Sequence, residues 1–368
     1  MSAAPGSVTA ANDRHILALA KYGPRAASTR QRLLQYAPYL AGSGIDIDLR
    51  PLLDDTYLAG LMKGDRASRI GVARAYARRL VDVAAMRDHD LLWIQYEMFP
   101  YLPLIDGLLA RFASRPIVYD IDDAIFHMYD AHPSATIRRL LGGKLRPLVR
   151  HAAVCLCGND YLAQYVTAAG GRAVMVPTVV DIDHFRPGLR RDQPSLTVGW
   201  IGSPSTWRYV EPLLPTLLPA MTRLGARFRV VGAGPAARGI AGIDAVEWEE
   251  AREVADLQAM DIGLMPVPDE PWARGKCGYK LIQYMACGVP GIASPVGVNG
   301  VIVDHGMDGL LARSPADWVA GLEQLARDPD LRARMGGHGR AKVVANYSLQ
   351  SQQPVVLGAF RAAMGDAA

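Results

Sequence analysis

Short runs of apolar residues alternate along the chain with longer stretches in which apolar positions recur at helical spacing. Apolar runs bounded by glycine, proline or polar residues predict buried strands, and the stretches between them predict amphipathic helices. In the first half of the chain, the predicted strands cover residues 15–20, 45–49, 91–95, 116–121, 154–157 and 174–177. Strands separated by helices indicate an α/β fold with a mostly parallel, doubly wound sheet.

The alternation stops at residues 186–195 and then restarts. This segment is polar and contains two prolines and a glycine, which is typical of a linker. After it, strands are predicted at residues 196–201, 228–231, 245–248, 262–266, 291–294 and 310–312. We therefore expect two Rossmann-like domains that face each other across a cleft, the first over residues 13–188 and the second over residues 195–345.

Length and composition agree with this organisation. The chain has 368 residues, of which 50% are hydrophobic, and this is enough for two cores. No run of 18 apolar residues occurs in the sequence, and residues 1–12 lack the apolar block of a signal peptide. We therefore expect a cytoplasmic protein.

The cysteines predict neither a disulfide framework nor a zinc site. Cys155, Cys157, Cys277 and Cys287 are too few and too irregularly spaced for a framework of bridges. Cys155 and Cys157 fall on one side of a predicted strand, where small buried hydrophobic residues are more common than metal ligands. We expect all four to be free thiols.

Positive charge is concentrated in the first half of the chain. The net charge is +4, whereas residues 1–190 carry 23 Lys and Arg against 18 Asp and Glu, a net charge of +5. Such an excess is compatible with an anionic membrane surface or a phosphorylated acceptor, and it is too small to indicate nucleic-acid binding. Within residues 138–150, five basic residues are interleaved with apolar ones. This segment is either a helix that rests on anionic lipid or an amphipathic helix with a solvated basic face, broken at Gly142 and Gly143.

Residues 272–294 combine glycines, positive charge and a predicted helix start. Gly275 and Gly278 allow backbone N–H groups to approach a ligand, and Arg274, Lys276 and Lys280 place positive charge near the same point. The helical pattern that follows begins near Gly278, so the free N–H groups and positive dipole end of the helix face the loop. This combination suits a diphosphate, although a simple turn with solvated cations explains the same residues equally well.

Three carboxylates lie at the end of the strand predicted at residues 116–121. Asp120 and Asp122 fall on one side of the strand end, and Asp123 falls on the other. They belong either to a catalytic region or to a structural group that caps a loop.

Several segments, taken in order, resemble glycosyltransferase family 4, the retaining enzymes with the GT-B fold that use nucleotide sugars. In the first half they are YGPRAASTR (22–30), PIVYDIDD (116–123) and VPTVVDIDHFRP (176–187). In the second half they are VGWIGSP (198–204), VVGAGP (230–235), MDIGLMP (260–266) and GYKLIQYMACGVP (278–290). The resemblance extends over nearly the whole chain from about residue 16, and the last segment is its most specific part.

The resemblance implies that the second domain binds a nucleoside diphosphate sugar and that the first domain binds the acceptor. It also implies that a final helix, residues 349–364 within a terminal segment 346–366, returns to the first domain. No metal or other cofactor is expected, because a helix dipole, backbone amides and basic side chains stabilise the departing diphosphate in such enzymes. The aspartates at the end of the 116–121 strand also resemble the metal-binding Asp-x-Asp of the other large glycosyltransferase fold, but the glycine loop argues against that fold.

This sequence departs from the family pattern at two positions that normally hold glutamate. The matching residues are Gly275 and Gln283. Gln283 can still hydrogen-bond a ribose, whereas Gly275 offers only its backbone, so Asp269 and Glu270 become candidates for the sugar contact. Likewise Ser203 replaces a basic residue after the first strand of the second domain. Trp248 is expected on a strand, either near the nucleobase or, more commonly for such a residue, in the core.

From the resemblance we assign three groups of site residues. The catalytic candidates are Asp122, which matches a histidine near the transferred sugar, and the cations Arg208 and Lys276. The donor-binding candidates are Gly202, Ser203, Arg274, Gly275, Cys277, Gly278, Tyr279, Lys280 and Gln283. The acceptor-binding candidates are Ser28, Thr29, Arg30 and Glu97. No metal ligand is assigned.

The function expected is transfer of a sugar from a nucleoside diphosphate donor to a hydroxyl on a saccharide or lipid-linked acceptor, in bacterial surface polysaccharide or glycolipid assembly. Peripheral contact with an anionic membrane would accompany it, and nucleic acid is not an expected partner. The alternative is a nucleotide-sugar-binding protein without catalysis, or a subunit of a larger transferase, because Gly275 lacks the sugar-binding carboxylate. An inverting GT-B enzyme of the epimerase type is a weaker third reading, because no acid/base pair stands out in the sequence.

Overall fold

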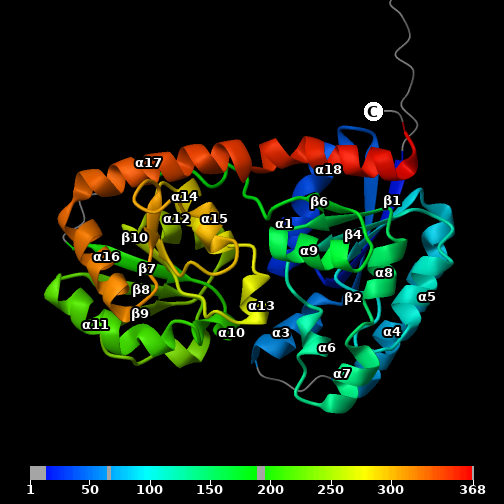
Figure 1. Cartoon of the computed structure of the whole chain (residues 1–368), viewed down its shortest axis with the longest axis horizontal. Helices are drawn as coiled ribbons and strands as arrows, with labels where there is room; N and C mark the ends of the chain where they lie inside the picture. The colour runs from blue at the N-terminus through cyan, green and yellow to red at the C-terminus, as the bar shows by residue number, and fades with distance from the viewer. Residues whose placement is uncertain (1–13, 64–67, 189–194, 367–368) are drawn as a thin grey trace, which may run out of the picture.

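The computed structural model describes residues 14–63, 68–188 and 195–366, which form two α/β domains side by side (Figure 1). Each domain is built on a six-stranded, parallel sheet with helices on both faces. The sheet order is β2-β1-β3-β4-β5-β6 in the first domain and β12-β11-β10-β7-β8-β9 in the second. This is the doubly wound arrangement expected from the alternation of strands and helices.

The strands coincide closely with the predicted apolar runs because parallel strands are covered on both faces and must be apolar throughout. The first sheet contains β1 (Arg14–Tyr22), β2 (Ile45–Leu53), β3 (Leu91–Gln95), β4 (Ile117–Ile121), β5 (Val154–Cys157) and β6 (Ala173–Met175). The second contains β7 (Thr197–Ile201), β8 (Arg227–Val231), β9 (Ile243–Val246), β10 (Ile262–Met265), β11 (Gly291–Ala293) and β12 (Gly309–Leu311). Two boundaries were wrong: β2 continues to Leu53, four residues beyond its predicted end, and β9 ends at Val246, so Trp248 follows the strand instead of lying on it.

Helices connect successive strands in both domains. Those of the first domain are α1 (Ala27–Arg32), α2 (Ala37–Ala41), α3 (Asp55–Lys63), α4 (Arg69–Ala84), α5 (Ile105–Arg111), α6 (His127–Asp130), α7 (Ala135–Leu141), α8 (Arg146–His151) and α9 (Asp160–Ala168). Those of the second are α10 (Pro204–Trp207), α11 (Leu214–Arg223), α12 (Glu253–Gln258), α13 (Pro271–Arg274), α14 (Tyr279–Ala286), α15 (Asn299–Ile302), α16 (Pro315–Arg327) and α17 (Pro329–Asn346), before α18 (Leu349–Met364) ends the fold. No helix in the described ranges is long and apolar enough to cross a membrane.

The chain passes between the domains twice, and the two crossing segments are hydrogen-bonded to each other. The Val180 amide donates to the Tyr347 carbonyl over 3.1 Å, and the Leu349 amide donates to the Val180 carbonyl over 2.8 Å. α17 lies along the second domain and α18 along the first (Figure 1), where Phe360 packs edge-on against Trp93 with ring centroids 4.8 Å apart. Residues 189–194 of the linker expected at 186–195 lie outside the described residues.

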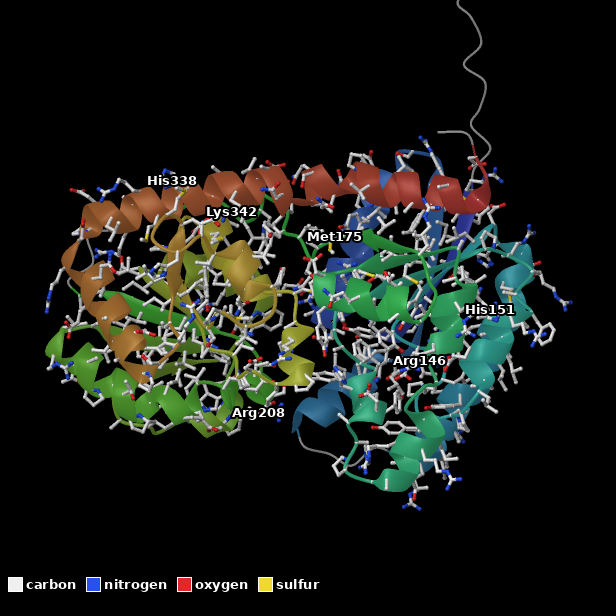
Figure 2. The ribbon with its side chains drawn as sticks, in the orientation of Figure 1. Arg146, His151, Met175, Arg208, His338 and Lys342 are labelled. Carbon is white, nitrogen blue, oxygen red and sulfur yellow. The ribbon has the colours of Figure 1, made fainter. Side chains whose placement is uncertain are left out.

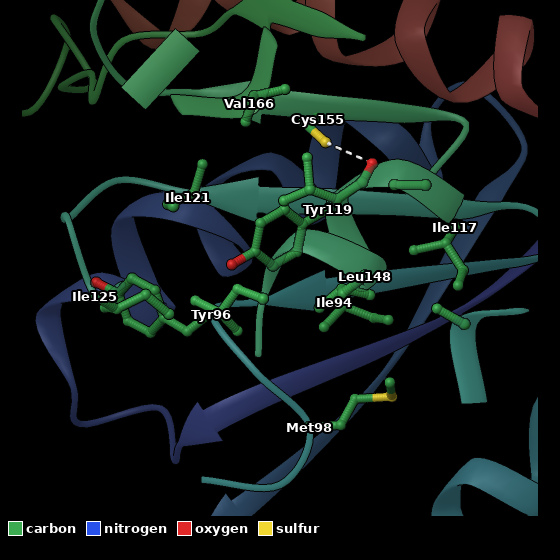
Figure 3. Close-up of a cluster of buried hydrophobic side chains, with 14 of the residues drawn as sticks. Ile94, Tyr96, Met98, Ile117, Tyr119, Ile121, Ile125, Leu148, Cys155 and Val166 are labelled. Carbon is green, nitrogen blue, oxygen red and sulfur yellow. Dashed lines mark hydrogen bonds between the residues drawn. The ribbon is translucent and has the colours of Figure 1, made fainter. Parts of the chain in front are cut away.

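The core of the first domain surrounds β3, β4 and β5 (Figure 3). Tyr119 and Cys155 lie in it, and the Cys155 thiol donates to the Val149 carbonyl over 3.8 Å. All four cysteines are free and buried, and burial had been predicted for Cys155 and Cys157. Burial raises the pKa of Cys157 to about 12, so this thiol stays protonated.

The basic segment 138–150 follows the expected amphipathic pattern with a solvated basic face at every basic residue except Lys144. α7 ends at Leu141, and α8 begins only at Arg146, so the break at the two glycines is confirmed. Lys144 between them is buried, with its Nζ 2.7 Å from Glu97 Oε2 and 3.0 Å from Asp106 Oδ2. This lysine therefore cannot belong to a solvated or lipid-facing surface, because its charge is neutralised inside the domain.

Candidate active site

A cavity of about 760 Å³ lies between the two domains. Its walls are the residues that follow the carboxyl ends of strands in both sheets, such as Tyr96 after β3 and Gly202 after β7. Ligands of doubly wound sheets bind at this edge, where loops are free to vary while the strands stay fixed. The first domain contributes Lys21, Tyr22, Arg25, Ala26, Ala27, Ser28, Arg30, Gln31, Leu58, Tyr96, Asp123, Ile125 and Met128. The second contributes Ile201, Gly202, Ser203, Pro204, Ser205, Gly232, Trp248, Glu253, Trp272, Tyr279, Lys280 and Gln283.

Two glycines bring the loops after β7 and β8 into direct contact. Gly232 has φ of +81°, and a Cβ built there would lie 2.3 Å from the Gly202 carbonyl oxygen. A Cβ on Gly202 would lie 2.7 Å from Cε of Lys280. Both positions therefore require glycine, which leaves backbone and the Lys280 side chain to form this wall.

Lys280 is the cation that the second domain contributes to the cavity lining. It lies at the start of α14, and its Nζ is 5.6 Å from the ring centroid of the buried Trp200. Burial, with a smaller contribution from Lys276, lowers the pKa of Lys280 to about 7, although Asp123 acts in the opposite direction. The first N–H groups of α14 have no partner within the helix and add partial positive charge at the same place.

A carboxylate that sequence reasoning missed holds two other residues that the second domain contributes to the cavity lining. Glu253 Oε1 accepts hydrogen bonds from Gln283 Nε2 over 3.0 Å and from Trp248 Nε1 over 3.1 Å. All three residues line the cavity. No motif marked Glu253, because it reaches Gln283 from a different helix, α12.

The predicted glycine loop packs against the first domain and does not line the cavity. A Cβ on Gly275 would lie 2.3 Å from the Ala124 Cβ. Asn159 Nδ2 donates to the carbonyls of Gly275 and Lys276 over 2.9 and 3.0 Å, and the Cys277 thiol donates to the Asp122 carbonyl over 3.0 Å. These contacts join residues 275–277 to the first domain, so a glutamate side chain could not be accommodated at position 275.

Gly278 is placed differently from the loop before it. It caps the start of α14 with φ of +66°, and a Cβ there would lie 2.4 Å from Ile302 Cδ1. Its role is therefore to let the chain turn into the helix whose next residues, Tyr279 and Lys280, line the cavity.

The other cations predicted for the catalytic and donor-binding groups lie outside the cavity. Lys276 Nζ is 3.5 Å from Asp123 Oδ1, and this pair bridges the domains beside the cavity. Arg274 is exposed and paired with Asp269 at 2.6 Å. Arg208 is exposed on the surface beside α10 (Figure 2) and donates to the Tyr209 hydroxyl over 3.1 Å. Neither Asp269 nor Glu270 lines the cavity, so neither supplies the sugar contact in this arrangement.

Asp122 lies just behind the wall of the cavity. Its Oδ1 is buried and has no hydrogen-bond partner among the described residues. Burial raises the pKa of Asp122 to about 7, with Arg32 opposing and the neighbouring carboxylates adding to the shift. Tyr96, which does line the cavity, lies beside Asp122 and Ser28 and has the unusual backbone angle φ of +65°. A left-handed tyrosine is strained, and such residues concentrate at functional sites.

The predicted acceptor residues divide into two pairs. Ser28 and Arg30 line the cavity, and the Arg30 guanidinium lies 5.4 Å from the Trp248 ring centroid across the domain boundary. Thr29 is fully buried and donates to the Tyr22 carbonyl over 3.0 Å. Glu97 is also buried, where its Oε2 accepts from the Tyr129 hydroxyl and from Lys144, each at 2.7 Å.

Lys21 and Arg25 line the same wall and were not predicted. Lys21 is the penultimate residue of β1, and its Nζ lies 3.5 Å from Glu97 Oε1. The sequence signal that could have identified Lys21 as a cavity residue is its position at the carboxyl end of a strand. Glu97 therefore pairs with Lys21, a cation that lines the cavity, and does not itself line the cavity.

Comparison with known proteins agrees with this architecture. Residues 195–328 match the family described as Glycosyl transferases group 1. The chain is 28% identical over 230 residues to D-inositol 3-phosphate glycosyltransferase of Segniliparus rotundus, covering 55% of this chain and 50% of that protein. It is 27% identical over 236 residues to the protein of the same name from Rhodococcus opacus, covering 56% and 51%. The chain thus spans about half the length of the curated relatives it matches.

Solved structures match over nearly the whole chain. Sucrose-phosphate synthase from Thermosynechococcus elongatus superposes with a TM-score of 0.72 at 15% identity, covering 96% of this chain and 99% of that one. HepE of Anabaena in complex with UDP-glucose superposes with a TM-score of 0.70 at 16% identity, covering 95% and 100%. The fold is that of the GT-B glycosyltransferases. The match to Glycosyl transferases group 1 lies in the second domain of this fold.

Proposed function

We propose that this protein transfers a sugar from a nucleoside diphosphate sugar to a hydroxyl acceptor, with retention of configuration and without a metal ion. The observation that carries the proposal is Lys280, a cation with a lowered pKa in an interdomain cavity, at the start of a helix and beside a glycine-only wall. A diphosphate placed there meets a cation, free N–H groups and backbone that can approach closely.

The remaining donor wall suits the nucleoside. Glu253 is a hydrogen-bond acceptor for ribose hydroxyls, and Gln283 and Trp248 hold its carboxylate in place. Glu253 thus places a carboxylate next to Gln283, the residue that stands where the family pattern has a glutamate. Trp248 offers an aromatic face to the cavity, and the Arg30 guanidinium stacks over the same ring.

In the transfer step, the acceptor oxygen forms a bond to the anomeric carbon as the bond from that carbon to the diphosphate breaks. The proton of the acceptor hydroxyl passes to the departing phosphate oxygen on the same face of the sugar, so the reaction needs no separate base. Lys280 and the start of α14 stabilise the charge that develops on the diphosphate. Because these groups supply the positive charge, the proposed mechanism needs no divalent cation.

The sugar contact must come from the first domain, since position 275 is closed. Tyr96 and Asp123 line the cavity, and Asp122 lies behind Tyr96. We assign the transferred sugar to this side, with the Tyr96 hydroxyl and the Asp123 carboxylate as its hydrogen-bond partners. Lys21, Arg25, Ser28 and Arg30 then face the acceptor.

The acceptor is proposed to be a saccharide or a lipid-linked sugar in bacterial surface polysaccharide or glycolipid assembly, reached from the cytoplasm with peripheral contact to an anionic membrane. Solved relatives give this support: HepE of Anabaena was determined with UDP and glucose, and a pneumococcal O-GlcNAc transferase with UDP and GlcNAc. The rival, a nucleotide-sugar-binding protein without catalysis, is favoured by one observation, the loss of a sugar-binding carboxylate at Gly275.

Thermal melting against UDP-, GDP-, dTDP- and ADP-sugars in the presence of EDTA tests the donor site. We expect one nucleotide class to raise the Tm, Lys280→Ala to abolish the shift, and Lys276→Ala, the adjacent lysine outside the cavity, to keep most of it. No shift with any donor, or equal effects of the two substitutions, would refute the assignment. Hydrolysis or transfer of the bound sugar by the purified chain then separates the enzyme from the non-catalytic rival.

A further inference from the structure

Helix α4 exposes several apolar residues to solvent and buries two charged ones. The residues it buries are Ala75, Arg79, Asp82 and Val83. Its outward residues at helical spacing are Ile70, Ala73, Ala77, Leu80, Val81 and Ala84, all exposed. Ile70 and Val81 are each 67% exposed. A helix that only covered its own domain would have few large apolar side chains as exposed as these.

Helix α5 extends the exposed apolar surface. Leu104 before it, Leu108 within it and Phe112 after it are 70%, 52% and 74% exposed. Two hydrogen bonds connect the chain around the two helices: the Tyr76 hydroxyl, in the middle of α4, donates to the Pro100 carbonyl before α5 over 2.6 Å, and Arg115 after α5 donates to the Arg87 carbonyl after α4 over 3.0 Å. Figure 1 shows α4 and α5 on the side of the first domain that faces away from the second.

The exposed charges around this surface are predominantly positive. Residues 68–116, all of which the structure describes, contain six exposed arginines and one exposed carboxylate, Asp88. The arginines are Arg69, Arg74, Arg78, Arg87, Arg111 and Arg115. The acidic residues nearest in the fold are engaged: Asp106 is buried against Lys144, and Asp48 on β2 pairs with Arg50 at 2.7 Å. We define the α4–α5 face as these six arginines together with six exposed large apolar residues of α4, α5 and their flanks. The apolar residues are Ile70, Leu80, Val81, Leu104, Leu108 and Phe112.

We propose that the α4–α5 face docks on an anionic lipid bilayer. Large apolar side chains flanked by arginines match the boundary between acyl chains and negatively charged headgroups, where the apolar residues insert and the guanidinium groups bind phosphate. An acidic protein partner would satisfy the arginines but would leave a stripe of isoleucine, leucine, valine and phenylalanine without a matching surface.

The position of the face fits a lipid-linked acceptor. Residues 101–104 leave the carboxyl edge of the first sheet, the edge that borders the cavity, and run into α5. The ring of the half-exposed Tyr101 packs against Tyr129, whose hydroxyl donates to Glu97, the carboxylate behind Lys21. This proposal names the surface for the membrane contact proposed above, and docking itself does not depend on the transfer reaction.

Sedimentation of the full chain with phosphatidylcholine vesicles, with and without phosphatidylglycerol, tests the docking. We expect binding only when phosphatidylglycerol is present. The triple variant Ile70→Ser, Val81→Ser, Phe112→Ser should weaken it by roughly tenfold or more. A matched variant of exposed apolar residues on the second domain, Val301→Ser, Met307→Ser, Val344→Ser, should bind as the unmodified protein does.

Charge reversal separates this face from other basic surfaces. Arg74→Glu with Arg111→Glu should abolish vesicle binding, whereas Arg361→Glu on α18 and the pair Arg138→Glu, Arg139→Glu on α7 should leave most of it. If the α7 pair abolishes binding while the α4–α5 pair does not, the basic segment 138–150 is the docking surface and this proposal is wrong.

Insertion is measured independently with Phe112→Trp, whose fluorescence should be quenched by brominated lipid, with Val344→Trp as the unquenched control. Absence of binding to phosphatidylglycerol vesicles, or equal binding by the triple variant, would overturn the proposal. So would a dimer of the free protein that the triple variant dissociates, because the face would then be covered by a second copy. The Tm of each variant and its response to donor show whether it is folded, and a failed donor site with intact vesicle binding would refute only the proposed function.

Discussion

Lys280 makes donor binding depend on pH in a direction fixed by its surroundings. In the free protein its pKa is about 7, so at pH 8 roughly one tenth of the molecules carry a charged Lys280. A diphosphate beside Nζ favours the charged form and returns the pKa toward its ordinary value near 10.5. Binding at pH 8 should therefore take up about 0.9 proton, and the affinity should fall roughly tenfold for each pH unit between 7 and the pKa of the complex.

Calorimetry measures this uptake directly. The apparent enthalpy of binding the nucleotide sugar identified by thermal melting is recorded at pH 8 in buffers of different ionisation enthalpy, such as Tris and Hepes, and the slope gives the number of protons. Lys280→Met should reduce the slope to near zero and weaken binding, while Lys276→Ala should retain it. A slope near zero in the unmodified protein, or an unchanged slope in Lys280→Met, would refute the claim that the diphosphate meets this lysine.

Three further outcomes follow from buried groups. Gly275→Glu should lower the free energy of unfolding by about 1–3 kcal/mol in chemical denaturation, since its Cβ would lie 2.3 Å from the Ala124 Cβ. The same substitution should enlarge the particle in solution scattering. An unchanged particle would contradict the close contact between the domains at this position. The pKa of Asp122 is raised from 3.8 to about 7, so the folded state binds more protons at this group than the unfolded state. Its contribution to stability is therefore lost as the pH rises through 7. Asp122→Asn should flatten the dependence of the free energy of unfolding on pH between about pH 4 and 7. Arg32→Ala should cost about 3–5 kcal/mol in denaturant melts, because it leaves the Asp120 carboxylate, 2.8 Å away, buried and unpaired; a loss below 1 kcal/mol would show that Asp120 is solvated or neutral.

The strands were predictable because a parallel sheet demands continuous apolar runs, and those runs are visible locally. The helix at 279–286 and the returning helix at 349–364 were visible for the same reason, since periodicity and caps are local. Of the donor residues, Gly202, Ser203, Tyr279, Lys280 and Gln283 do line the cavity. They follow a strand or begin a helix at the sheet edge, and the resemblance located both elements.

The rest of the site depends on which surface each loop meets, and sequence spacing does not contain this information. Gly275 and Cys277 have the spacing of an anion loop, yet they contact the first domain because Ala124 and Asn159 happen to face them. Glu253 reaches the site from another helix. The exposed stripe of α4 was missed because helical periodicity does not reveal which side of a helix its domain covers.

The paired crossing segments at Val180 and Ser348 have a consequence for turnover. Two backbone hydrogen bonds hold these segments together, so the domains can rotate about that line without breaking them. The contacts made by Asn159 and Cys277 lie beside the cavity and must break when the domains part. For the proposed sugar transfer, breaking these contacts would then precede departure of the nucleoside diphosphate from the cavity. Asn159→Ala should therefore speed product release while the line of rotation stays intact.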